Sequence, residues 1–125
     1  MSKAIMIVDD EEDIRNLYGE MLKRDFDKIL YASQGVQALN MLDHEKVDHM
    51  IIDLEMPNMD GYELAKLVKE KHPKIFMTIS TGSIISQDNI DILLSHGVLG
   101  FLYKPTSKVE LLNHIRCIQS LFPAR

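Results

Sequence analysis

The sequence predicts an α/β protein whose open, doubly wound parallel sheet is covered by helices on both faces. Five short apolar runs alternate with segments in which apolar residues recur at helical spacing. Strands separated by helices cannot pair as tight hairpins, so they are expected to run parallel. The 125 residues suit one compact domain and fall short of the roughly 200 that a closed eight-fold barrel needs. We therefore expect a single domain over residues 1–125.

The expected strands are the short apolar runs at residues 4–8, 29–32, 47–53, 75–80 and 98–103. A helix is expected after each strand, because apolar residues then recur at 14, 17, 21 and 22; 36, 39 and 42; 62, 64, 65 and 68; 90, 93 and 94; and 109, 112 and 115. Pro73 ends the third helix near residue 71 or 72, since the residue before a proline disfavours helix. Gly97 is expected to cap the fourth helix, and the fifth helix runs to about Leu121.

The composition is that of an ordinary globular protein, with 46% hydrophobic and 26% charged residues. No apolar run approaches the roughly 20 residues that span a bilayer, and the N-terminal run is too short for a signal peptide. We therefore expect a cytoplasmic protein without membrane contact. The net charge of −5 and the lack of a Lys/Arg cluster argue against nucleic-acid binding. The single cysteine, Cys117, excludes an internal disulfide and is expected to pack in the last helix.

Acidic, basic and hydroxyl side chains follow four of the expected strands, at the same edge of the sheet. In an open α/β sheet, ligands bind beyond the carboxyl ends of the strands, where the strand order reverses. With a strand order of 2-1-3-4-5, the first and third strands flank that point. The residues at the strand ends are Asp9 and Asp10, Asp53, Ser80 and Thr81, and Lys104.

This set of side chains suits phosphoryl chemistry. Three neighbouring carboxylates repel one another unless a cation lies between them, and Mg²⁺ prefers carboxylate and water oxygens. Lys104 adds a permanent positive charge, a hydroxyl can donate a hydrogen bond, and a carboxylate can itself be the nucleophile. Each feature alone is commonplace, because acids after a strand are often solvated turns. Their occurrence together at successive strand ends is far more specific.

Four motifs occur in order: VDDE at residues 8–11, DLEMPNMDG at 53–61, STG at 80–82 and GFLYKP at 100–105. With these motifs the chain resembles a response-regulator receiver domain, the phosphoacceptor half of two-component signalling, over essentially its whole length. The resemblance implies the flavodoxin-like strand order 2-1-3-4-5. It also implies a regulatory domain rather than an enzyme, with at most self-catalysed phosphotransfer and autodephosphorylation.

By this resemblance, Asp53 is the phosphorylated aspartate. Asp10, Asp53 and the backbone carbonyl of Glu55 would coordinate Mg²⁺ (or Mn²⁺), with Asp9 assisting through water. Lys104 would pair with a phosphoryl oxygen of the product. Pro57, Gly61 and the candidate helix cap Asp60 shape the loop that follows Asp53.

The resemblance assigns the switch to Thr81, which would hydrogen-bond the phosphoryl group, and to Phe101, the aromatic residue that would reorient. Glu55 and Ser83 would tune how long the phosphoryl group persists. Ser80 competes with Thr81 for the hydroxyl role, and the spacing leaves the choice open. Phe101 replaces the tyrosine that is often found there, so only its packing can switch.

One departure from the family pattern lies just after Lys104, where Thr106 occupies a position at which phenylalanine is common. The peptide bond before Pro105 could be cis, as in the family, or trans.

The expected function is a phosphorelay switch. A histidine kinase or phosphotransfer protein would donate a phosphoryl group to Asp53. The surface of the fourth helix, fifth strand and fifth helix would then change and bind a downstream protein or output domain, with a homodimer also open. The alternatives are a degenerate receiver that only binds protein, or a haloacid-dehalogenase-like phosphatase, which would place a D-x-D motif on its first strand. The Met1 start fits a natural N-terminus, and the end at LFPAR leaves a stand-alone domain, a longer regulator and a hybrid kinase open.

Overall fold

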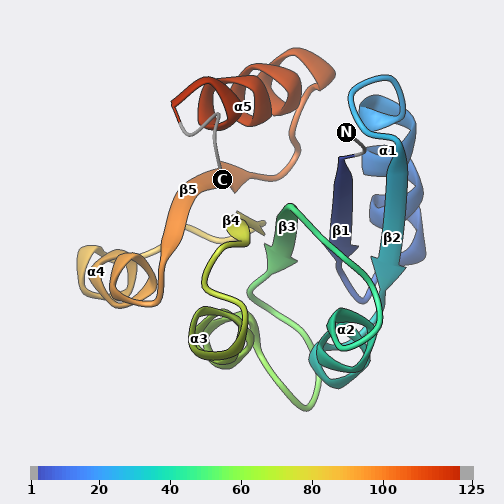
Figure 1. The fold of residues 1–125 in the computed structure, drawn as a ribbon. Coiled ribbons are helices and arrows are strands. Elements are labelled where there is room, and N and C mark those ends of the chain that lie inside the picture. Colours follow the sequence, from blue (N-terminus) through green and yellow to red (C-terminus); the bar gives the residue numbers. More distant parts are fainter. Residues whose placement is uncertain (1–2, 122–125) are drawn as a thin grey trace.

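The computed structural model describes residues 3–121, so both ends of the domain expected at 1–125 lie outside the described range. Five strands and five helices alternate: β1 (Ala4–Val8), α1 (Glu12–Leu22), β2 (Lys28–Ala32), α2 (Gly35–Leu42), β3 (His49–Asp53), α3 (Gly61–Lys71), β4 (Phe76–Thr81), α4 (Gln87–Ser95), β5 (Val98–Tyr103) and α5 (Lys108–Leu121). All neighbouring strands pair in parallel, in the order β2-β1-β3-β4-β5 (Figure 1). The predicted fold class and strand order are confirmed.

Three strands differ from the sequence prediction by one or two residues at their ends. β2 begins one residue earlier than expected, at Lys28. β3 begins at His49 rather than at residue 47, because pairing with β1 starts there. β4 covers residues 76–81 rather than 75–80, since the Ile75 N–H bonds the His72 carbonyl and belongs to the turn after α3. This shift brings Thr81 into the strand.

Local signals set the helix ends as predicted. The Asp60 carboxylate accepts the Glu63 N–H at 3.0 Å and caps α3. The same helix ends at Lys71, two residues before Pro73. Gly97 follows α4 with a φ of +88°, a conformation that favours glycine.

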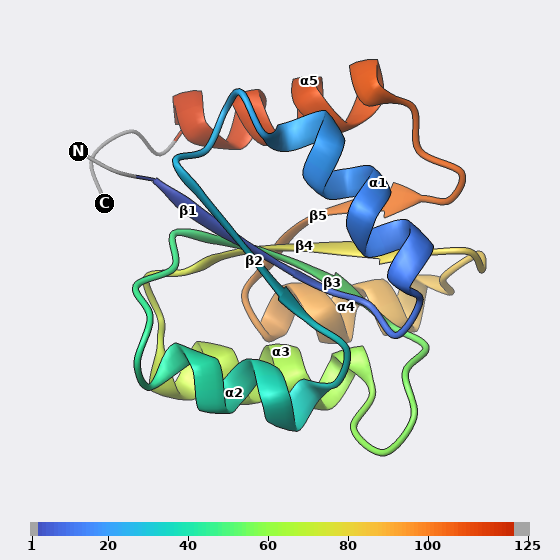
Figure 2. The ribbon, with the colours of Figure 1, turned by 90° about the vertical axis from the view of Figure 1, so that its right-hand side faces the viewer.

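The helices form two layers around the sheet. Figure 2 shows α1 and α5 on one face and α2, α3 and α4 on the other. Each face buries its own apolar cluster, and strand side chains alternate between them: Met50 and Ile52 join one cluster and Ile51 joins the other. Cys117 is exposed on α5, so the expectation that it packs was wrong. No helix within residues 3–121 is long and apolar enough to cross a bilayer.

A chain of polar side chains lies under α5. Thr78, in the middle of β4, shares its hydroxyl between His49 of β3 and His114 of α5, each at 2.9 Å. His49 is buried and also contacts the ring of Phe76 edge-on. Burial lowers the pKa of His49 to about 3, with a further contribution from His114. His49 is therefore expected to be neutral in the folded protein at neutral pH.

Candidate functional site

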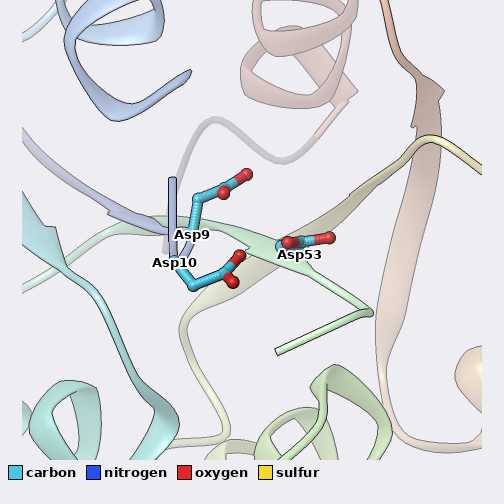
Figure 3. Close-up of side chains that lie close together, drawn as sticks. All are labelled: Asp9, Asp10 and Asp53. Carbon is cyan, nitrogen blue, oxygen red and sulfur yellow. The ribbon is translucent and has the colours of Figure 1, made fainter. Parts of the chain in front are cut away.

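Three carboxylates meet at the carboxyl edge of the sheet. Asp9 and Asp10 follow β1 and Asp53 ends β3, and the topology makes these strands direct neighbours. One oxygen from each carboxylate lies within 4.8 Å of the other two, as the close-up in Figure 3 illustrates. Asp9 and Asp53 are buried and Asp10 is exposed. The structure thus brings together the three acids that the sequence singled out.

Lys104 supplies the positive charge at the end of β5. Its Nζ donates to Asp9 Oδ2 at 2.8 Å and lies 3.7 Å from Asp53 Oδ1. Its backbone N–H donates to the Thr81 carbonyl at 2.7 Å, which ties the ends of β4 and β5 together. Burial lowers the pKa of Lys104, but the hydrogen bond to Asp9 and the charge of Asp53 outweigh this effect and raise it overall.

The pKa of the Asp53 carboxyl group is raised above its ordinary value. Only 4% of the residue is exposed. Burial, followed by the charge of Asp9, raises the pKa of Asp53 from 3.8 to about 6, against the opposing influence of Lys104 and a hydrogen bond from the Glu55 N–H. The first cause is the cost of a buried charge, and the second is its repulsion by the neighbouring carboxylate. A cation placed among the acids would relieve this cost.

Thr81, Glu55 and Ser83 form a small cluster beside the acids. The Ser83 hydroxyl donates to Glu55 Oε1 at 2.6 Å, and the Ser83 N–H donates to the Thr81 hydroxyl at 3.2 Å. The Thr81 hydroxyl itself points at the same Glu55 oxygen at 3.4 Å. The loops after β3 and β4 are therefore joined at the rim of the site, above the buried Thr81.

Ser80 makes a different bond from Thr81, on the opposite face of the sheet. Its hydroxyl lies 2.7 Å from the Tyr18 hydroxyl of α1. Strand alternation explains the split, because Ser80 shares the face of Thr78, whose hydroxyl bonds His114 of α5. The sequence left the two hydroxyls open, and the geometry favours Thr81 as the one beside Glu55.

The remaining predicted residues lie along β5 and the turn after it. Phe101 is half-buried, packs against the cluster under α4 and pairs in register with Ile79. The Lys104–Pro105 peptide is cis, which resolves the alternative that the sequence left open. Thr106 is buried and bonds Tyr18 and the Tyr103 carbonyl. Sequence reasoning missed Tyr18, because an apolar helix position gives no signal for a polar contact.

The three acids fit a divalent cation such as Mg²⁺. All the converging side-chain donors are carboxylate oxygens, which hard cations prefer. Burial and the charge of Asp9 raise the pKa of Asp53 in spite of Lys104, and a cation bound among the acids would lower it. The residues that would hold the ion are Asp9, Asp10 and Asp53.

Comparison with known proteins agrees with the fold. The profile of the response regulator receiver domain matches residues 5–116. Chemotaxis protein CheY of Halobacterium salinarum is 30% identical over 115 residues, which cover 92% of this chain and 95% of that protein. Response regulator GtcR of Aneurinibacillus migulanus is 34% identical over 117 residues, 93% of this chain but 47% of that protein. The chain therefore spans about half the length of some relatives.

Solved structures show the same architecture. A CheY-like receiver domain from Methanospirillum hungatei matches with a TM-score of 0.89 at 24% identity, over 96% of this chain and 95% of the other. TrrA from Thermotoga maritima, solved in complex with Mg²⁺ and BeF, matches with a TM-score of 0.81 at 28% identity, over 93% and 98% of the two chains. The chain belongs to the response regulator receiver domain family, the regulatory domains of two-component signalling.

Proposed function

We propose that the chain is a phosphoacceptor switch, in which Asp53 receives a phosphoryl group from a phosphohistidine of a histidine kinase or phosphotransfer protein. The observation that carries the proposal is the convergence of Asp9, Asp10 and Asp53 within 4.8 Å, with Lys104 at 2.8 Å from Asp9. Acids and a lysine at this edge suit the binding of a phosphoryl group better than they suit a structural role, because the acids repel one another.

The chemical step is a direct transfer. A carboxylate oxygen of Asp53 attacks phosphorus, the bond from phosphorus to the imidazole nitrogen breaks, and its electron pair returns to the ring. Lys104 is close enough to pair with an oxygen of the group once it is on Asp53. Asp10, Asp53 and the Glu55 carbonyl would hold Mg²⁺ (or Mn²⁺), with Asp9 assisting through water, and the bound ion would supply positive charge that neutralises the phosphoryl oxygens.

The switch would begin at Thr81. Its hydroxyl, 3.4 Å from Glu55, would turn to the phosphoryl group, and the space it leaves would admit Phe101, which already packs on the cluster under α4. Phosphorylation then shifts a population between two arrangements of α4, β5 and α5. Exposed apolar side chains on these elements suit a downstream protein, an output domain or a second copy: Leu94, Leu99, Tyr103 and Val109.

Uptake of phosphate from labelled acetyl phosphate tests the proposal. We expect stoichiometric, Mg²⁺-dependent, acid-stable but hydroxylamine-sensitive labelling of the wild-type chain, as an acyl phosphate requires. Asp53→Asn should abolish the label. Asp43→Asn, an exposed acid after α2, is the matched control and should label like the wild type. Unchanged labelling of Asp53→Asn would refute the assignment.

The two alternatives predict different results in the same assay. A degenerate receiver would bind no Mg²⁺ and take up no phosphate, although all three acids and Lys104 are in place. A phosphatase would turn over a phosphate monoester repeatedly rather than stop at one phosphate per chain.

A further inference from the structure

We propose that Tyr18 is a positioning residue, which places Lys104 for phosphoryl transfer through a series of hydrogen bonds between buried hydroxyls; this inference rests on the function proposed above. Tyr18 lies on α1, outside the acidic pocket, and is only 1% exposed. It is a buried polar group that the transfer step itself does not use. Its hydroxyl contacts Ser80 and Thr106, which flank the two residues that would hold the phosphoryl group.

The direction of each hydrogen bond follows from counting protons. Thr106 donates to the Tyr103 carbonyl at 3.2 Å, so its oxygen is free to accept from Tyr18 at 3.3 Å. The single Tyr18 proton is then used, so Ser80 donates to Tyr18 at 2.7 Å. The chain therefore runs from Ser80 through Tyr18 and Thr106 to the Tyr103 carbonyl. The Ser80 bond has ordinary hydroxyl length and the other two are longer and weaker.

The two ends of this hydrogen-bonded series lie next to Thr81 and Lys104 in the sequence. Ser80 is the neighbour of Thr81 on β4. Tyr103 precedes Lys104, and Thr106 follows it by two residues. The Lys104 N–H also donates to the Thr81 carbonyl at 2.7 Å, so the two segments are already joined on the sheet side. Tyr18 adds a second link between these segments from α1, through its hydrogen bonds with Ser80 and Thr106.

Because the three hydroxyls are buried, losing any one of them leaves another without a hydrogen-bond partner, which destabilises the fold. Tyr18, Ser80 and Thr106 are each at most 7% exposed. A buried hydroxyl that loses its partner costs more than the bond contributed, because it cannot turn to water. The hydrogen bonds from Ser80 through Tyr18 and Thr106 therefore favour one conformation of the turn that carries Lys104. The acids are placed separately, by β1 and β3, so Tyr18 should act on the lysine side alone.

The test uses Tyr18→Phe, which keeps the ring and removes the hydroxyl. Three quantities are measured: Mg²⁺ affinity, the affinity for beryllofluoride at saturating Mg²⁺, and the rate of labelling by acetyl phosphate. We expect beryllofluoride affinity and labelling rate to fall by roughly threefold to tenfold, the equivalent of one lost neutral hydrogen bond. Mg²⁺ affinity should stay within about twofold, because its ligands are held elsewhere. Ser80→Ala removes the same bond from the other side and should give the same result if Tyr18→Phe folds poorly.

A lysine-free background separates positioning from general support. If Tyr18 acts through Lys104, adding Tyr18→Phe to Lys104→Ala should lower beryllofluoride affinity by less than about 1.5-fold further. An equal loss in both backgrounds would show a merely structural role and overturn the proposal. Thr78→Val is the matched control, since it removes a buried β4 hydroxyl outside the chain and should leave beryllofluoride affinity unchanged.

The outcomes also separate this inference from the proposed function. A wild-type chain that neither labels nor binds beryllofluoride would refute both. A wild-type chain that does both, with Tyr18→Phe equal to it, would refute the role of Tyr18 alone.

Discussion

At the scale of single residues, the protein places a carboxylate where its charge is costly. Asp53 is buried next to Asp9, and its pKa is raised to about 6. The folded, metal-free state therefore holds a proton on Asp53 more tightly than the unfolded state does. The stability that this proton contributes is complete below the unfolded value of 3.8 and is lost as the pH rises through about 6.

Asp53→Asn should therefore stabilise the metal-free protein near neutral pH. Asparagine stays neutral, so it avoids the cost of the charge, and we expect a gain on the order of 1–2 kcal/mol at pH about 7.5 after allowing for hydration at the pocket mouth. The gain should shrink as the pH falls toward about 4.5, because wild-type Asp53 is then protonated too. Urea unfolding at several pH values measures it. A variant less stable than the wild type at neutral pH would contradict the cause given for the raised pKa.

The Glu55–Ser83 pair should govern the lifetime of the phosphoryl group. The 2.6 Å bond between these side chains lies over Thr81, where water would approach. Glu55→Ala and Ser83→Ala each open this rim, so we expect dephosphorylation to become faster by about threefold, with Mg²⁺ affinity nearly unchanged. Loss of label after removal of the donor measures the rate. Glu45→Ala, which breaks a distant ion pair with Lys28, is the control, and equal lifetimes in all four proteins would contradict the prediction.

At the scale of elements, the first residue of α3 lies in close contact with the end of β3, the strand that carries Asp53. A Cβ on Gly61 would lie 2.6 Å from the Asp53 carbonyl oxygen and 2.8 Å from the Leu54 Cα. These are backbone atoms, so they cannot turn aside. The close approach lets the Gly61 N–H donate to the Leu54 carbonyl at 3.1 Å, which fixes the loop that leaves Asp53.

Gly61→Ala should therefore affect both stability and phosphorylation. We expect a loss of about 1–3 kcal/mol in unfolding free energy, since the helix must move away from β3, and slower labelling because Asp53 moves with it. Gly82→Ala is the matched control, as a Cβ there meets nothing within 4 Å, and it should change stability by less than about 0.5 kcal/mol. Similar effects of the two substitutions would contradict the steric explanation.

Element boundaries show what local sequence signals can and cannot fix. Pro73 and Gly97 act through their own backbone, so they placed the ends of α3 and α4 correctly. The start of β3 depends on which residue of β1 pairs with His49, and no local signal carries that pairing. The exposure of Cys117 likewise depends on how α5 is rotated on the sheet.

At the scale of the whole molecule, the sequence predicted which charged residues meet at the edge of the sheet, but not the buried hydrogen bonds around them. The strand ends determine where Asp9, Asp53 and Lys104 lie once the strand order is known. The tie from Tyr18 to Ser80 joins residues 62 positions apart on different layers, and only packing reveals it. The same holds for the histidines that share Thr78.

The buried His49 should make global stability fall in acid. Its pKa of about 3 lies below its ordinary value of 6.5, so the unfolded chain binds a proton first as the pH falls. Stability should drop by about 2 kcal/mol between pH about 7 and 5 from this residue, opposite in sign to the effect of Asp53. His49→Leu should remove that slope, whatever its stability at neutral pH. Parallel stability curves for the two proteins would contradict the prediction.

The bond from Lys104 to Asp9 joins residues 95 positions apart. During synthesis, Asp9, Asp10 and Asp53 therefore leave the ribosome before Lys104, the lysine that contacts Asp9 in the folded protein. Until β5 docks beside β4, Asp53 has repelling neighbours and no counter-charge. The candidate site therefore depends on the last strand of the sheet, because its acids acquire their neighbouring cation only when β5 is in place.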